Sequence, residues 1–436
     1  MTQLFDYLSE NIRNNEQVLF KEKRQTHNLD KIFKVVEKFI IDRKLICYGG
    51  TALNNILPLD RQFYNYDLTS PDYDFFSTTA YDDVLLLANI FKEKGYENIR
   101  AKSAIHDGTY KLYVNYVPVA DITQMDPILF NQLSLNTVVR DKINYSPIHF
   151  LRMSMHLELS RPRGDLTRWE KILKRLDILN DVYPFTITKC ESNINYDLNK
   201  EKDKSIFSGI HSILVNQSSK IIYIGEYAIN QYAQFFTKQY QKIIQKNNKP
   251  TFVILHNEPN SIIQNIRNKY NSHNVINKKI DEIDDVIPEI NNIFIDNSLY
   301  LVVIKPTGCQ NYNSITKHGN VHHIGTIDTI LYYYFLMIYV EFQRQTTFYD
   351  NLMCIAFLMF NIQTKIMTRK SKLLNRFNLS CIGNQVTFED IIDKKRRKYD
   401  RLKHNKQSLK YKKSFLDYTP RTKKNKTLKR KSKPKK

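Results

Sequence analysis

Apolar residues recur at two different spacings in the first third of the chain. From Leu29 to Ile40 they lie three or four positions apart, which predicts an amphipathic helix within residues 1–44. Leu45–Tyr48 is a short apolar run that is followed by a glycine pair, as expected of a strand and a turn. Residues 51–57 then predict the start of a second helix.

Strand-like and helical patterns continue to about residue 130. The run Asp72–Phe76 suits a strand, a helix is predicted from about Thr79 to Lys94, and Thr109–Tyr116 and Val117–Ile122 suit two more strands. This order predicts an α+β catalytic domain over residues 1–130, with a mixed sheet and flanking helices.

The rest of the chain divides by pattern into four further segments. Residues 131–190 read as helical, and 191–204 are polar and suit a linker. Within 205–393 the order helix, strand, turn, helix returns. At an offset of 175 residues, Tyr48 falls on Tyr223, Gly50 on Gly225 and Asn55 on Asn230. No acidic pair lies on the later strand-like runs, so we expect a degenerate copy of the first domain, followed by helices.

The positive charge is concentrated in the last segment, residues 394–436. It holds 21 Lys or Arg against two Asp, a balance of +19 out of the net +22 of the whole chain. With so little apolar content we expect a disordered basic tail. Such a tail binds nucleic acid through counterion release, or serves as a targeting or packaging tag. The sequence leaves both functions open.

Cysteine usage and hydropathy indicate the kind of compartment in which the protein acts. The five cysteines are odd in number, far apart and without a CxxC pair, so we expect no disulfide framework and a reducing compartment. The longest apolar run, Thr329–Val340, is shorter than the roughly 20 residues of a membrane span and predicts a buried helix. We expect no membrane partner. Cys309, His318, His322 and His323 match no familiar zinc spacing.

Three aspartates and a glycine turn carry the candidate chemistry. Asp72 and Asp74 are two positions apart in a predicted strand and would project from the same face. Asp121, on a neighbouring predicted strand, would complete a hard-oxygen site for two Mg²⁺ or Mn²⁺ ions. Gly49, Gly50 and Thr51 open a helix whose N–H groups could bind a triphosphate. Either motif alone is common, but their combination in this order favours catalysis.

This combination resembles the polymerase-β-like nucleotidyltransferase superfamily, although the gap from Gly50 to Asp72 is longer than its usual spacing. The segments CYGGTALN, SPDYDFFS and SRPRGDLTRWEKILKRL are more closely similar to the poly(A) polymerase catalytic subunits of large cytoplasmic DNA viruses, the giant-virus, asfarvirus and poxvirus type. The resemblance covers about residues 40–180. It implies ATP as donor, an RNA 3′ end as acceptor, Asp72, Asp74 and Asp121 as metal ligands, and a second, inactive nucleotidyltransferase-like domain.

The same resemblance implies a setting in the host cytoplasm or virus factory, with packaging in the virion left open. It also leaves open a homodimer or a separate processivity subunit. Basic side chains supply the remaining predicted contacts, although a solvated helix face would show the same pattern. For ATP these are Lys171 and Lys174; for RNA they are Arg161, Arg163, Arg168, Lys394, Lys395, Arg396 and Arg397.

The predicted function is template-independent addition of AMP from ATP to RNA 3′ ends by two-metal in-line transfer. Two other functions stay open from sequence alone. One is a different nucleotidyltransferase that adds CMP or UMP or modifies a protein. The other is a non-catalytic RNA-binding scaffold.

Overall fold

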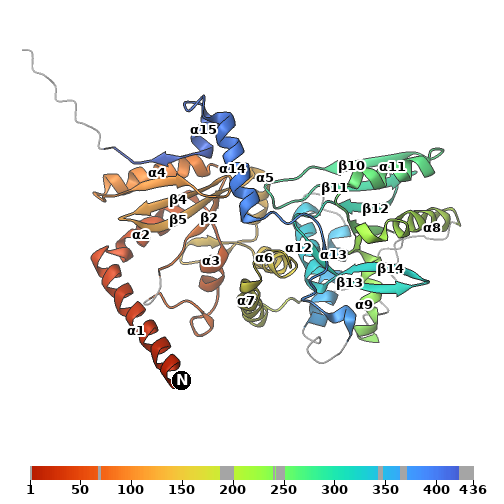
Figure 1. The fold of residues 1–436 in the computed structure, drawn as a ribbon, viewed down its shortest axis with the longest axis horizontal. Coiled ribbons are helices and arrows are strands. Elements are labelled where there is room, and N and C mark those ends of the chain that lie inside the picture. Colours follow the sequence, from red (N-terminus) through yellow and green to blue (C-terminus); the bar gives the residue numbers. More distant parts are fainter. Residues whose placement is uncertain are drawn as a thin grey trace, which may run out of the picture.

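The computed structural model has two halves, each built on a mixed β-sheet, with helices packed between them (Figure 1). It describes residues 2–66, 70–186, 201–238, 241, 251–341, 347–363 and 371–421. The predicted linker 191–204 therefore lies mostly outside the described residues, as does the tail beyond residue 421.

The first half contains the strand, turn, helix order that the sequence predicts. Its helices are α1 (Thr2–Thr26), α2 (Leu29–Arg43), α3 (Gly49–Ile56), α4 (Ala80–Glu93), α5 (Pro127–Ser134), α6 (Ile148–Leu159) and α7 (Trp169–Val182), with short 3₁₀ turns at Leu59–Arg61 and Leu166–Arg168. Its strands are β1 (Ile46–Tyr48), β2 (Asp74–Ser77), β3 (Arg100–Ser103), β4 (Thr109–Val114), β5 (Val117–Gln124), β6 (Val138–Arg140) and β7 (Ile143–Tyr145).

The second half repeats this plan. Its helices are α8 (Glu201–Val215), α9 (Glu226–Tyr232), α11 (Pro259–Lys269), α12 (Ile327–Glu341) and α13 (Thr347–Gln363), with 3₁₀ turns at Ser218–Lys220, Ala233–Phe235 and Lys372–Leu374. Its strands are β8 (Ile222–Tyr223), β9 (Phe252–Leu255), β10 (Val275–Ile280), β11 (Ile290–Ile295), β12 (Ser298–Ile304), β13 (Gln310–Lys317), β14 (Asn320–Gly325) and β15 (Cys381–Ile382). The chain ends with α14 (Phe388–Leu402), α15 (Leu409–Ser414) and β16 (Asp417–Tyr418).

The two sheets correspond strand for strand. Their orders are β16-β3-β4-β5-β2-β1-β7-β6 and β10-β11-β12-β9-β8-β14-β13-β15. Apart from β16 and β15, each strand has a counterpart with the same neighbours. The pairing directions also agree: β1 is antiparallel to β2 and parallel to β7, as β8 is to β9 and β14. The expected α+β fold and its degenerate second copy are confirmed.

A shared irregularity fixes the register between the copies. The β4–β5 turn at Asn115 and Tyr116 and the β11–β12 turn at Asp296 and Asn297 both have two positive φ angles, the geometry of a tight hairpin. Each ladder then shifts by one residue at the same distance from its turn, which is a β-bulge.

With this register, Gly49 corresponds to Gly225, one residue away from the expected match of Gly50 to Gly225. A Cβ at Gly49 would lie 2.7 Å from Asp74 Oδ2, and one at Gly225 would lie 2.7 Å from Val253 Cβ. The returning order of elements predicted the repeat correctly, but two adjacent glycines gave no means of choosing between them.

The two halves are joined through a buried interface of α6 and α12. Asp328 of α12 accepts hydrogen bonds from Arg376 at 2.6 and 2.7 Å and lies 2.9 Å from His156 Nδ1 of α6. Phe76 and Phe150 of the first half are buried in the same apolar cluster as α12 and α13. The apolar run predicted as a buried helix is α12. No described helix is long and apolar enough to cross a membrane.

The expectation of a disordered tail from Lys394 is wrong for residues 394–421. α14 begins with a capping box at Thr387 and Asp390, which satisfies its first N–H groups. β16 then pairs antiparallel with β3, and Arg100 binds Asp417 through two contacts of 2.6 and 2.7 Å. Figure 1 shows this blue segment returning from the second half to the first. A partner strand thus compensates for the low apolar content.

The expectation of no disulfide is also wrong. Cys309 and Cys381 are bonded, although 72 positions separate them. Cys309 directly precedes β13, and the β13–β15 ladder pairs Cys381 with Asn311, so the sheet brings the two sulfur atoms together. A pairing between strands this distant in sequence has no local signal. Cys47 is buried and free.

Candidate active site

The three predicted aspartates meet where β2 and β5 lie side by side. Asp74 is the first residue of β2, and its partner in the parallel ladder is Asp121 of β5. Asp72 lies just before the strand rather than within it. Its backbone N–H donates to Thr51 Oγ1 at 3.2 Å, and its carbonyl accepts from the Asp74 N–H at 3.2 Å. A turn at Asp72, instead of plain strand alternation, therefore holds the acidic pair.

Two of these carboxylates, Asp74 and Asp121, have raised pKa values. Burial, followed by repulsion from Asp72 and Asp121, raises the pKa of Asp74 to about 7. Burial also raises the pKa of Asp121, against the opposing effect of the Lys111 ammonium that contacts it. Repulsion between neighbouring carboxylates destabilises the site when no cation is bound, and carboxylates with raised pKa values are typical of functional sites.

Each of the two positions, 49 and 50, favours glycine for a different structural reason. Gly49 has φ +76°, a left-handed conformation that a side chain rarely adopts, and it packs directly against Asp74. Gly50 admits Tyr64, whose hydroxyl would lie 2.6 Å from a Cβ there. The pair thus lets the α3 N-terminus approach both Asp74 and the loop that follows α3. Thr51 is 2% exposed and supports Asp72, so its hydroxyl is occupied within the protein.

The Tyr-rich insertion explains the long spacing between Gly50 and Asp72. The Asn54 side chain of α3 accepts hydrogen bonds from the backbone of Phe63 and Tyr64, at 2.9 and 2.8 Å. The insertion is therefore folded back onto α3, and the glycine turn still reaches the acidic pair.

The basic residue of α7 that stands beside the glycine pair is Arg175. Its guanidinium donates to Tyr64 at 2.7 Å, lies 4.4 Å from the Phe63 ring centroid and would be 3.3 Å from a Cβ at Gly50. Lys174 is exposed and paired with Glu170 at 2.5 Å, and Lys171 is exposed. Lys174 and Arg175 lie three and four positions after Lys171 on the same helix, but only the fold shows that Arg175 reaches the turn.

Two further groups of the site have no sequence signal of their own. Lys111 of β4 contacts Asp121 because β4 and β5 are paired. Tyr48 shares a 2.8 Å hydrogen bond with Thr123 and stacks on Phe76 at 3.9 Å between ring centroids. Both contacts depend on strand register, which the sequence pattern alone does not determine.

The fold brings only some of the residues predicted to bind RNA together. Arg161, Lys394 and Lys395 line one cavity of about 540 Å³, between the β3–β4 turn, loops of the second half and α14. Acidic side chains line it as well, among them Asp107 and Glu289. The remaining predicted residues are exposed elsewhere and do not line it: Arg163, Arg168, Arg396 and Arg397.

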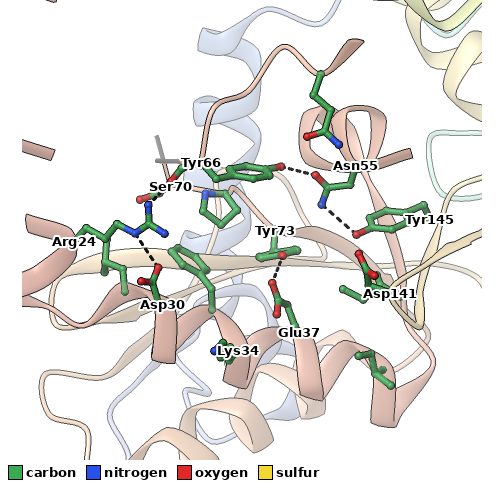
Figure 2. A pocket seen from close by; sticks show the side chains of 16 residues that line it. Arg24, Asp30, Lys34, Glu37, Asn55, Tyr66, Ser70, Tyr73, Asp141 and Tyr145 are labelled. Carbon is green, nitrogen blue, oxygen red and sulfur yellow. Dashed lines mark hydrogen bonds and ion pairs between the residues drawn. The ribbon is translucent and has the colours of Figure 1, made fainter. Parts of the chain in front are cut away.

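A second cavity, of about 620 Å³, lies behind the acidic strand (Figure 2). Tyr73, between the two aspartates in sequence, faces it and donates to Glu37 at 2.6 Å. Asn55 connects Tyr66 and Tyr145 across the same space, at 2.7 and 3.1 Å. These polar groups satisfy one another, and Asp72, Asp74 and Asp121 do not line this cavity.

The donor set fits a divalent cation such as Mg²⁺ or Mn²⁺, since hard cations prefer carboxylate oxygens. Among the described residues, no three His, Cys, Asp or Glu side chains are grouped so that they could hold an ion as they stand. In this arrangement the Lys111 ammonium contacts Oδ2 of the third carboxylate, Asp121. Burial and repulsion from Asp72 and Asp121 raise the pKa of Asp74, and a bound cation would oppose both effects.

The second half has no equivalent cluster. In the shared register, Val253 and Val302 take the positions of Asp74 and Asp121, and Thr251 takes that of Asp72. The Thr251 hydroxyl donates to the Leu299 carbonyl at 2.9 Å. The expected loss of carboxylates from the second copy is thus complete.

A mixed sheet with a glycine turn packed against strand-borne aspartates defines a protein of the nucleotidyltransferase fold. Residues 34–165 match the family model described as the poly(A) polymerase catalytic subunit.

Similar proteins come from large DNA viruses. The chain is 31% identical over 182 residues to a candidate poly(A) polymerase catalytic subunit of African swine fever virus, strain Badajoz 1971 Vero-adapted, which is 40% of this chain and 38% of that protein. It is 35% identical over 158 residues to one of Acanthamoeba polyphaga mimivirus, 35% of this chain and 26% of that protein. The matches therefore span well under half of these relatives.

The crystal structure of the Megavirus polyadenylate synthase superposes with a TM-score of 0.77. The superposition covers 96% of this chain and 84% of that one, at 18% sequence identity. At this identity the likeness shows the fold, and it extends over both halves.

Proposed function

We propose that this chain is a poly(A) polymerase that transfers AMP from ATP to the 3′ hydroxyl of RNA. The observation that carries the proposal is the Asp74–Asp121 pair, aligned in register and packed against Gly49. The family match over residues 34–165 and the viral relatives support adenylate as the transferred group.

Asp72, Asp74 and Asp121 would hold Mg²⁺ or Mn²⁺. The bound ions would supply charge neutralisation for the attacking hydroxyl and the departing pyrophosphate. The pKa of Asp74 at about 7 means that this carboxyl gives up its proton near neutral pH when a cation binds. Thr51 accepts a hydrogen bond from the Asp72 N–H and so helps to hold the backbone that carries this carboxylate.

The α3 N-terminus positions the triphosphate in this scheme. Gly49 and Gly50 leave room for phosphate oxygens near backbone N–H groups, where the helix dipole favours negative charge. Arg175, beside Gly50, is placed to neutralise a phosphate, in addition to the predicted Lys171 and Lys174.

RNA would reach this site from the cavity that contains Arg161, Lys394 and Lys395. The basic face of α14, with Arg396 and Arg397, and the exposed Arg163 and Arg168 would hold the backbone farther away. The family description as a catalytic subunit supports a separate partner subunit, and a second copy of the chain is the alternative. We infer a site of action in the cytoplasm of an infected cell, with packaging in the virion as a further proposal.

A label-transfer assay tests this function. The full chain is incubated with Mg²⁺ or Mn²⁺, an RNA oligonucleotide and ATP labelled at either the α- or the γ-phosphate. Label should enter RNA from α-labelled ATP alone, and an RNA that ends in 3′-deoxyribose should accept none. Incorporation of γ-label, or extension of the 3′-deoxy RNA, contradicts the proposal.

A further inference from the structure

One register row crosses the first sheet from its edge to the aspartates. The ladders pair Asp417 with Lys102, Lys102 with Lys111, and Lys111 with Asp121. Asp121 is then paired with Asp74. Directly paired residues project from the same face of a sheet, so two lysines lie in line with the two carboxylates.

A β-bulge creates this alignment. β5 has one residue, Val119, without a partner on β4. Without that extra residue, the hairpin would pair Lys111 with Ala120, because a shift by one residue sends side chains to the opposite face. The bulge therefore brings an ammonium onto the third carboxylate of the site.

The second half shows what happens when the carboxylates are absent. Its bulge is kept, yet the residue at the position of Lys111 is Asn292, which faces Val302. The Asn292 amide donates to the Lys278 carbonyl within the sheet, at 3.3 Å. The second half therefore lacks both the lysine and the aspartate of this pair, although it keeps the β-bulge that would align them.

We propose that Lys111 is a built-in counter-ion that a divalent cation must displace from Asp121, so that Lys111 sets the metal affinity of the site. The inference rests on the proposed function, since it assumes that these aspartates bind metal. Lys111 is a positioning residue here: it holds Asp121 in the metal-free chain and releases it when an ion binds.

The exposure of the pair makes the exchange feasible. The Lys111 side chain is 39% exposed and that of Asp121 is 14% exposed, so the ammonium can swing into solvent while the carboxylate stays. Lysine has a long flexible stem and a strongly hydrated head group, which lowers the cost of its release. An incoming cation competes with Lys111 for Asp121 Oδ2, and the two positive charges repel each other.

The test is Mn²⁺ binding to the full chain without nucleotide or RNA, measured from the electron paramagnetic resonance signal of free Mn²⁺. Lys111→Met should bind Mn²⁺ about tenfold more tightly than the wild type, because the competing charged hydrogen bond is gone. Lys111→Arg should restore wild-type affinity. Lys102→Met, one strand farther along the same row, is the matched control and should change affinity less than twofold. Thermal unfolding verifies that each variant is folded.

The inference is overturned if Lys111→Met binds Mn²⁺ no more tightly than the wild type does. It is also overturned if Lys111→Arg binds Mn²⁺ as tightly as Lys111→Met. The Asp74→Asn variant tests the proposed function on which this inference rests. If Asp74→Asn leaves Mn²⁺ affinity unchanged in both the wild type and Lys111→Met, the aspartates are not the metal site and both proposals fall.

Discussion

At the scale of single residues, Gly49 combines an unusual backbone conformation with a direct contact to the Asp74 carboxylate. Its φ of +76° and its contact with Asp74 are independent constraints, and a matched control separates them. Gly319 has nearly the same φ, +77°, with no atom within 4 Å of a Cβ. Both Gly→Ala variants should lose about 1 kcal/mol of unfolding free energy or somewhat more.

Only Gly49→Ala should also lose activity, by about tenfold or more, because its methyl group displaces the Asp74 carboxylate. Denaturant unfolding and adenylate incorporation measure the two effects. Equal activity of the two variants would show that the contact between Gly49 and Asp74 does not position the carboxylate.

Asp74 also predicts how the stability of the metal-free chain depends on pH. Its folded-state pKa, about 7, is above the unfolded value of 3.8. Its protonation therefore favours the fold at low pH, and this stabilisation is lost as the pH rises through 7. With EDTA, the wild type should lose roughly 2 kcal/mol relative to Asp74→Asn between pH 5 and pH 8. Parallel stability profiles of the two proteins would refute the raised pKa.

Residue identity alone located the three aspartates and the glycine turn, since each lies in a strong local pattern. It did not locate Lys111 or the Cys309–Cys381 bond. Lys111 faces Asp121 only because of the bulge at Val119. Contacts that depend on strand register or on distant strands leave no periodic trace in the sequence.

At the scale of elements, the last described strand completes the catalytic sheet. Leu416 is buried in the core of the first half, its carbonyl accepts from Ser103, and Asp417 binds Arg100. Tyr418 donates to Asn89 at 2.8 Å. β16 is thus an integral part of the fold, which composition did not predict because the segment around it is so basic.

Two truncations separate the tail from this strand. A chain that ends at residue 415 should unfold at lower denaturant, by roughly 2 kcal/mol or more, because it uncovers the β3 edge and removes the Leu416 side chain. A chain that ends at residue 421 should keep its stability but show weaker RNA binding with a shallower salt dependence. Equal stability of the two truncated chains would contradict the role assigned to β16.

At the scale of the whole molecule, the two halves form one structural unit. The catalytic strand β2 contributes Phe76 to a cluster that belongs mainly to the second half, and the buried Asp328 binds residues from both sides of the interface. The second half has lost the aspartates but keeps the strand order. The second half packs against the half that carries the aspartates, and the sequence predicted the copy without predicting this interface.

Removing one partner of the buried Arg376–Asp328 pair should destabilise the whole chain. The Arg376 guanidinium holds the pKa of Asp328 well below its usual value despite complete burial. Arg376→Gln should cost about 3 to 5 kcal/mol of unfolding free energy, since an uncompensated carboxylate remains buried. Exposed Arg163→Gln is the control and should change stability little. Unfolding of the halves in separate transitions by the wild type would contradict a single unit.

The central claim is that the aspartates catalyse template-independent transfer of adenylate. Its most direct test is extension of a short RNA by the full chain, with Mg²⁺ or Mn²⁺ and each of the four nucleoside triphosphates in turn, beside the Asp72→Ala/Asp74→Ala variant. The account predicts long products with ATP alone and none from the variant, which should stay folded. Extension by the variant at the wild-type rate, or products with another nucleotide and none with ATP, would contradict it.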